Sequence, residues 1–176
     1  SIVDSYGNAL SMTTTIENSF GSRLMTNGFL LNNELTDFSF RSHNNGVPIA
    51  NRVEPGKRPR SSMSPTIVLK DGLPVLVIGS PGGSRIIGYV VQAIVAHIDW
   101  GMDVQAAVSI PHAVNRFGNF DLEKNTSLVN MVEPLEALGY KVNLLTLNSG
   151  LHAISIAQDG LVGGADPRRE GIVLGQ

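Results

Sequence analysis

The sequence contains no cysteine among its 176 residues. That absence excludes a disulfide framework and a zinc site held by thiolates. Charge is also scarce, because charged residues make up only 16% of the chain and the formal net charge is −2. The densest basic run, residues 57–60, is too short for a nucleic-acid footprint. We therefore expect no nucleic-acid partner.

A long uninterrupted apolar run is also missing. The longest such stretch, residues 86–98, is broken by Gly88, Gln92 and His97. It is too short to span a membrane and instead predicts a buried helix. No signal peptide is recognisable at the start. Since the chain opens abruptly at Ser1, it could be a processed or truncated product whose targeting segment lay upstream.

Hydrophobic residues make up 42% of the chain, a share typical of a globular protein. We find no internal repeat and no clear linker, so we predict one domain over residues 1–176. The predicted elements follow the chain in this order: a hairpin over residues 1–16, a strand at 28–32, a hairpin at 65–79, helices at 84–100, 103–110 and 131–138, and strands at 140–145 and 152–158. This order indicates an α+β fold in which helices cover an antiparallel sheet. Apolar residues cover most of the circumference of the helix at 84–100, so we expect it to be sandwiched.

The strongest local signal is the segment Gly-Ser-Pro-Gly-Gly-Ser at residues 79–84, between an apolar strand and an apolar helix. Gly82 and Gly83 allow unusual backbone dihedrals and a close approach of a ligand. A helix start also offers N–H groups and a positive dipole end to an anion or a developing oxyanion. An ordinary tight turn explains the glycines equally well. The phosphate-loop and dinucleotide motifs are both missing.

Three weaker signals involve hydroxyl and carboxyl groups. The adjacent hydroxyls of Ser61 and Ser62 could hold a carboxylate, although such runs are more often plain loops. Glu34 and Asp37 share a face if they lie in a helical turn, where they could bind an ammonium group or simply face water. A threonine run ending at Thr15 usually reflects strand propensity, yet one hydroxyl could face an active site.

The four histidines are scattered and show no metal-ligand spacing, so we expect no metal and no cofactor. We expect His97 to be structural and His112 to lie in a loop. A Ser-His-Asp triad stays open because triads are assembled in space, although the Gly-x-Ser-x-Gly motif is missing. The polar segment at residues 41–60 is long for a structureless connection, and loops of that length are often lids or binding loops.

Four longer motifs occur in the order and approximate spacing of one known family. They lie at residues 20–22, 31–38, 55–67 and 79–87. The Ala-Asp-Pro-Arg-Arg segment at 165–169 and the closing Gly-Gln fit the same pattern. Each motif is weak alone, but together they are highly specific. Over essentially its whole length, the chain resembles the small subunit of γ-glutamyltranspeptidases.

The resemblance implies the αββα sandwich of the N-terminal-nucleophile hydrolases, of which this chain would supply the small-subunit portion. Members are made as a precursor that cleaves itself into a large and a small subunit. The new N-terminal threonine attacks a γ-glutamyl amide and uses its own amine as the base. Water, an amino acid or a peptide then accepts the γ-glutamyl group. The implied donor is glutathione-like, and the implied location is periplasmic or secreted. The large subunit would be the partner, and without it the chain could self-associate.

The resemblance also assigns catalytic roles to single positions. Gly82 and Gly83 match the glycines whose N–H groups form the oxyanion hole, and Thr15 matches the threonine that supports the nucleophile. The nucleophile itself matches a position four residues before Ser1. We therefore expect this chain to be inactive without that threonine and the large subunit. The alternative is a catalytically inactive domain that only folds, binds or assembles.

Substrate-binding positions follow in the same way. Ser61 and Ser62 match the pair that binds the α-carboxylate of the donor, and Glu34 and Asp37 match the acidic pair that holds its α-ammonium group. Glu17 departs from the pattern, because many members carry an asparagine there that touches the α-amino group. This departure leaves open a cephalosporin or glutaryl acylase, whose donor lacks the amino group. Retention of both other carboxylates favours a glutamyl donor.

Overall fold

The computed structural model describes residues 1–175, which fall into two compact units. Unit 1 contains residues 1–13 and the chain from residue 62 onward, and unit 2 contains residues 14–61. This division leaves the prediction of one domain undecided.

The central element of unit 1 is a four-stranded antiparallel sheet in the order β13-β12-β8-β7. Its strands are β7 (Thr66–Lys70), β8 (Leu73–Gly79), β12 (His152–Ala157) and β13 (Gly160–Ala165). Asp71 and Gly72 join β7 to β8 and both have positive φ, at 52° and 81°. That is the backbone of a two-residue type I′ hairpin, so the predicted hairpin is confirmed.

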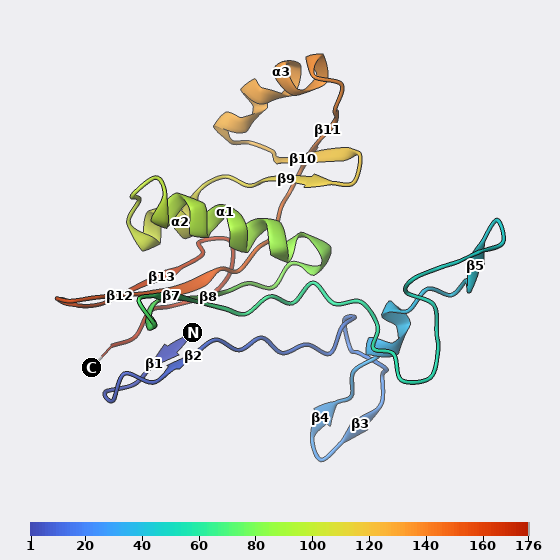
Figure 1. The fold of residues 1–176 in the computed structure, drawn as a ribbon, viewed down its shortest axis with the longest axis horizontal. Helices are drawn as coiled ribbons and strands as arrows, with labels where there is room; N and C mark the ends of the chain where they lie inside the picture. Colours follow the sequence, from blue (N-terminus) through green and yellow to red (C-terminus); the bar gives the residue numbers. More distant parts are fainter. Residues whose placement is uncertain (176) are drawn as a thin grey trace. The chain divides into compact units, whose positions relative to one another are not determined.

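Two helices lie on one face of this sheet (Figure 1). They are α1 (Ile86–Ile98) and α2 (Val104–Ser109). The core between helices and sheet includes Leu76 of β8, Tyr89 of α1 and Val108 of α2, each at most 1% exposed. Removing this apolar surface from water is the main force that holds the layers together.

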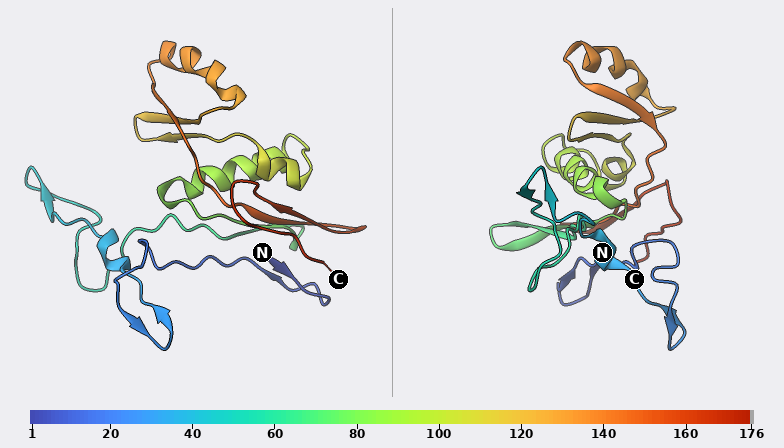
Figure 2. Two further views of the ribbon diagram at one scale, coloured as in Figure 1. Left: turned by 180° about the vertical axis from the view of Figure 1, so that it is seen from behind. Right: turned by 90° about the vertical axis from the view of Figure 1, so that its right-hand side faces the viewer.

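A second, three-stranded sheet covers α1 from the other side within unit 1, as Figures 1 and 2 show from three directions. Its strands β9 (Ala113–Arg116), β10 (Asn119–Glu123) and β11 (Lys141–Leu145) lie in the order β11-β10-β9. The pair β9–β10 is antiparallel and the pair β10–β11 is parallel. The crossover between β10 and β11 carries the short helices η3 (Ser127–Met131) and α3 (Val132–Ala137).

The prediction that α1 is sandwiched is correct for two of its sides and wrong for a third. Ile87, Val91 and Ile98 are 52%, 53% and 48% exposed. No element among the described residues covers this flank.

The N-terminal hairpin of unit 1 pairs β1 (Ile2–Val3) with β2 (Ala9–Leu10). Ser11 Oγ donates to the carbonyl of Ile78 at 2.9 Å, which ties the hairpin to the four-stranded sheet. The expected second strand, which extended to residue 16, ends at Leu10 instead. The threonine run at residues 13–15 therefore lies outside any strand.

Unit 2 consists of short elements joined by turns. They are β3 (Met25–Thr26), β4 (Phe29–Leu30), η1 (Glu34–Asp37), β5 (His43–Asn44) and β6 (Val47–Pro48). The predicted strand at residues 28–32 is β4, and the segment at 41–60 contains the β5–β6 hairpin. Within residues 1–175, no helix is both long and apolar enough to cross a bilayer.

Candidate functional site

The double-glycine turn of unit 1 lies where the sequence places it, between β8 and α1. Gly82 has φ 141° and ψ 13°, and Gly83 has φ 59° and begins the short helix η2 (Gly83–Arg85). L side chains rarely adopt these dihedrals. A Cβ added at Gly82 would lie 2.7 Å from Cε2 of Tyr89, whereas one added at Gly83 would meet nothing within 4 Å. Packing therefore explains Gly82, while Gly83 leaves open space beside the N–H groups of a helix start.

A cluster of carboxylates is the main feature of unit 2. Glu34 and Asp37 lie in one 3₁₀ turn, as the spacing predicts. Burial raises the pKa of Glu34 above its ordinary value, and the negative charges of Asp37 and Glu17 raise it further. Oε2 of Glu34 is shielded from solvent and has no hydrogen-bond partner in the described structure. Two further negative groups, those of Glu17 and Asp37, thus act on the carboxyl group that carries the unsatisfied oxygen.

Local hydrogen bonds hold Glu17 in this cluster. Its φ of 69° lies in the left-handed region, which is uncommon for a residue with a side chain. Thr15 Oγ1 accepts the N–H of Glu17 at 2.8 Å, and Asn33 Nδ2 donates to Glu17 Oε2. The resemblance predicts that Thr15 supports the nucleophile, and this stays a prediction. Within unit 2 its hydroxyl supports the backbone at Glu17.

Asn33 is the organising residue that sequence reasoning missed. Besides Glu17, its Nδ2 donates to Thr36 Oγ1 at 2.8 Å, and its Oδ1 accepts the N–H of Asn18 at 3.0 Å. One amide thereby joins the segment before β3 to the η1 turn. Asn32 and Asn33 are adjacent in the sequence, and only the fold distinguishes them.

The electrostatics of this cluster favour a cation. Within residues 1–175, none of Glu17, Glu34 and Asp37 forms an ion pair. A primary ammonium group would offset their mutual repulsion and supply three donors to the carboxylate oxygens. Among the described residues, no group of three or more His, Cys, Asp or Glu has the arrangement of a metal site.

The eight predicted site residues divide between the two units. Unit 2 holds Thr15, Glu17, Glu34, Asp37 and Ser61, and unit 1 holds Ser62, Gly82 and Gly83. Ser61 is exposed and Ser62 is half-buried. The structure brings together the carboxylates with Thr15, and the two glycines with each other. That all eight form one site stays a prediction.

Three buried side chains in unit 1, a serine, a histidine and an aspartate, are joined by hydrogen bonds and bear on the alternative of a Ser-His-Asp triad. Ser149 Oγ donates to Asp166 Oδ2, so its single proton is used, and His112 Nε2 donates to Ser149 Oγ over 2.6 Å. All three residues are at most 1% exposed. Burial lowers the pKa of His112 to about 4, so its ring is neutral at pH 7. Serine lies between the acid and the histidine, in the wrong order for a nucleophile, so these three residues do not form a catalytic triad.

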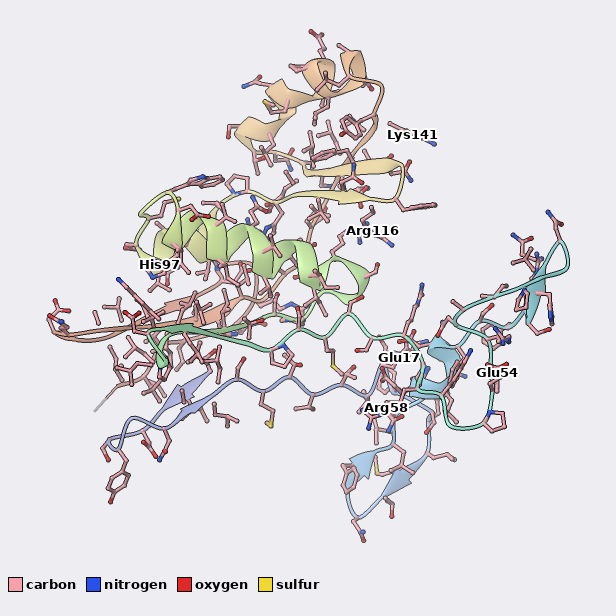
Figure 3. All side chains as sticks on the ribbon, viewed as in Figure 1. Glu17, Glu54, Arg58, His97, Arg116 and Lys141 are labelled. Atoms are coloured by element: carbon pink, nitrogen blue, oxygen red, sulfur yellow. The ribbon has the colours of Figure 1, made fainter. Side chains whose placement is uncertain are left out.

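His97 has the structural role that the sequence predicts. His97 lies near the C-terminal end of α1 (Figure 3). Its Nδ1 lies 2.8 Å from the carbonyl oxygen of Met102, and its Nε2 lies 3.1 Å from Ser155 Oγ. The ring therefore links the helix to the following loop and to β12.

The whole chain matches one family of known proteins. The family model for γ-glutamyltranspeptidase matches residues 1–176. The chain belongs to the γ-glutamyltranspeptidase family. It is 40% identical to the glutathione hydrolase proenzyme of Bacillus subtilis (strain 168) over 181 residues, which cover 99% of this chain and 30% of that protein. It is 42% identical to the glutathione hydrolase proenzyme of Escherichia coli (strain K12), with 96% and 30% covered.

Solved structures agree with the sequence comparison. A crystal structure of a mutant Helicobacter pylori γ-glutamyltranspeptidase superposes with a TM-score of 0.84 and 40% identity, covering 96% of this chain and 97% of that one. The chain spans only 30% of the length of the two curated relatives.

Proposed function

We propose that this chain is the small-subunit part of an enzyme that cleaves γ-glutamyl amides and transfers the γ-glutamyl group to water, an amino acid or a peptide. The observation that carries the proposal is the carboxylate cluster of Glu17, Glu34 and Asp37 around the unpartnered Glu34 Oε2. A γ-glutamyl donor carries a free α-ammonium group, which fits such a cluster. A glutathione-like molecule is the proposed donor.

The proposed chemistry proceeds through an ester. A threonine hydroxyl, supplied by the precursor outside the present 176 residues, attacks the γ-carbonyl, and its proton passes to its own α-amine. The carbonyl oxygen becomes an oxyanion beside the N–H groups of Gly82 and Gly83. Collapse of this intermediate expels the amine, which takes up the proton, and leaves the γ-glutamyl ester. Water or an acceptor amine then attacks the ester and regenerates the hydroxyl.

The remaining groups bind the donor. In this proposal Ser61 and Ser62 hydrogen-bond its α-carboxylate, and Thr15 keeps the nucleophile and Glu17 in place. A zwitterionic head group held at both charges directs its γ-carbonyl to the reacting atoms, which lowers the entropic part of the barrier.

The proposal extends to fold, partner and location. The four-stranded sheet of unit 1, covered on one face by α1 and α2, supports one sheet and one helical layer of an N-terminal-nucleophile αββα sandwich, which a large subunit of the same precursor would complete. The name "proenzyme" borne by the two curated relatives supports processing of such a precursor. We place the enzyme in the periplasm or outside the cell, and we propose that the chain self-associates when it lacks the large subunit.

The test removes one charge of the cluster and changes the substrate to match. The precursor that contains this chain is assayed with γ-glutamyl-p-nitroanilide and with glutaryl-p-nitroanilide, which lacks the α-ammonium group. Glu34→Gln is expected to lower kcat/KM for the γ-glutamyl substrate by about 10–100-fold, since hydrogen bonds to charged groups contribute about 1.5–3 kcal/mol. The glutaryl rate should stay the same or rise. Glu136→Gln, at an exposed position of α3, is the matched control.

Each alternative predicts a different result. Equal loss on both substrates would mean that Glu34 does not recognise the ammonium group. A wild-type preference for the glutaryl substrate would establish the acylase. If the processed protein cleaves neither substrate, the result favours the alternative of a catalytically inactive domain.

A further inference from the structure

The side chain of Arg85 runs from the glycine turn to a buried ion pair. Its Nε donates to Asp121 Oδ2 at 2.9 Å, and its Nη2 lies 2.8 Å from the same oxygen in an ion pair. Asn143 Nδ2 donates to the other carboxylate oxygen at 2.9 Å. Asp121 is 2% exposed, so water cannot readily replace these donors. The ion pair thus links η2 to the central strand, β10, of the three-stranded sheet.

The carboxylate of Asp121 is kept charged by these partners. Burial alone would raise its pKa, but the hydrogen bond from Asn143 and the ion pair with Arg85 outweigh burial and hold the pKa below its ordinary value. Removing one partner of a buried ion pair leaves an uncompensated charge, which is strongly destabilising locally. The contact between Arg85 and Asp121 is therefore costly to break.

Arg85 is connected to the glycines through its own backbone. Its N–H donates to the carbonyl of Gly82 at 3.3 Å and closes the 3₁₀ turn that contains Gly83. The opposite side of the turn is held by Ser80, whose Oγ donates to the Pro81 carbonyl at 2.7 Å and accepts the N–H of Gly150 at 3.3 Å. Glycine has no side chain to fix its dihedrals. The orientation of the turn must therefore come from its neighbours.

We propose that Asp121 is a positioning residue, which holds Arg85 and thereby aligns the backbone N–H groups of Gly82 and Gly83 without touching the substrate. This inference rests on the proposed function, because it concerns N–H groups that stabilise an oxyanion. Such donors stabilise the transition state more than the bound substrate. Their misalignment lowers kcat and leaves the KM for the donor nearly unchanged.

The experiment compares two variants with a matched control in the processed enzyme made from the full precursor. Asp121→Asn keeps the shape of the side chain and loses its charge, and Arg85→Lys keeps the charge and loses the two-atom contact. The control is Glu123→Gln, because Glu123 lies on the same strand and pairs with Arg168 at 2.7 Å, not with Arg85. Active sites are counted by covalent titration so that kcat refers to competent enzyme.

The two test variants are expected to lower kcat for γ-glutamyl-p-nitroanilide by about 10–100-fold, because a misplacement of about 1 Å can cost about 100-fold. KM should change by less than about threefold. The double variant should be no worse than Asp121→Asn alone, since both changes break one contact. The control should lower the melting temperature and keep kcat within about twofold.

A second measurement follows the turn directly. Hydrogen exchange of peptides that cover residues 80–90 should be faster in Asp121→Asn and Arg85→Lys than in the wild type and in Glu123→Gln. Should Asp121→Asn fail to fold, Arg85→Lys carries both measurements, because the Arg85 side chain is 26% exposed.

Three outcomes overturn the inference: unchanged kcat in correctly counted Asp121→Asn, an equal loss of kcat in Glu123→Gln, or unchanged exchange over residues 80–90. A wild-type enzyme that does not cleave the substrate would instead sink the proposed function. Hydrogen exchange would then still decide whether Asp121 orders the turn.

Discussion

At the scale of single residues, the two adjacent glycines of the turn are glycine for different reasons. A side chain at Gly82 would collide with the ring of Tyr89, whereas one at Gly83 would project into open space. Both have positive φ, at 141° and 59°. The packing of the fold therefore requires glycine only at position 82. At position 83 a side chain would strain the backbone but would not collide with its surroundings.

This difference predicts unequal results for the two alanine variants. Gly83→Ala should lower the free energy of unfolding by about 1–2 kcal/mol, the cost of a left-handed residue with a side chain. Gly82→Ala should lower it by more, because the ring of Tyr89 must also move. Urea unfolding of the two variants in the mature protein measures this order, and equal losses would contradict the packing account.

His112 makes a pH-dependent contribution to stability. Its pKa is lowered by burial from 6.5 to about 4, so the unfolded chain binds more protons between these values. Its contribution is therefore fully present above pH 6.5, falls as the pH drops, and is lost below about pH 4. We expect His112→Gln to show a smaller fall in melting temperature between pH 7 and pH 4.5 than the wild type. Parallel curves for the two proteins would show that this side chain is not the source.

Residue identities in the candidate site were predictable only where a motif carried them. Glu34, Asp37 and the two glycines stood in motifs, and their local geometry is as expected. Asn33 could not be distinguished, because its role depends on a contact with Glu17 that spans 16 positions. The sequence did not indicate a role for Asp121, because its contact with Arg85 depends on strand β10, which was not predicted.

At the scale of elements, the residues at the turn decided whether a hairpin could be predicted from the sequence. The β7–β8 hairpin has Asp-Gly at its turn between two apolar runs, which is a strong hairpin signal. The β9–β10 hairpin turns at Phe117 and Gly118, with φ of 42° and 94°. Phenylalanine is unusual at that position, so its sequence did not indicate a turn and the second sheet was not predicted.

Helix α2 offers a direct test of local sequence signals. Asp103, the predicted start, is its N-cap and accepts the N–H of Ala106 at 2.7 Å. Asp103→Ala should lower the free energy of unfolding by about 1 kcal/mol. Asp99→Ala is the control, because Asp99 lies at the C-terminal end of α1, where a negative charge is not favoured. The capping account fails if both variants lose the same stability in urea unfolding.

At the scale of the whole molecule, many of the side chains that the chain leaves exposed are large and apolar. The exposed flank of α1 and the side chains of Leu10, Met12 and Trp100, between 47% and 65% exposed, are large hydrophobic groups. We expect the proposed large subunit to cover these side chains, since exposed apolar surface is typical of a place of association. Its extent could not be read from periodicity, because the pattern of a helix shows which residues avoid water and not which partner covers them.

The central claim is that a family member with this carboxylate cluster acts on donors that carry an α-ammonium group. The most direct measurement is the ratio of kcat/KM for γ-glutamyl-p-nitroanilide to that for glutaryl-p-nitroanilide, made on the unaltered precursor after processing. Two or more charge-assisted hydrogen bonds predict a ratio of about 100 or higher. A ratio near one, or in favour of the glutaryl compound, would contradict the account.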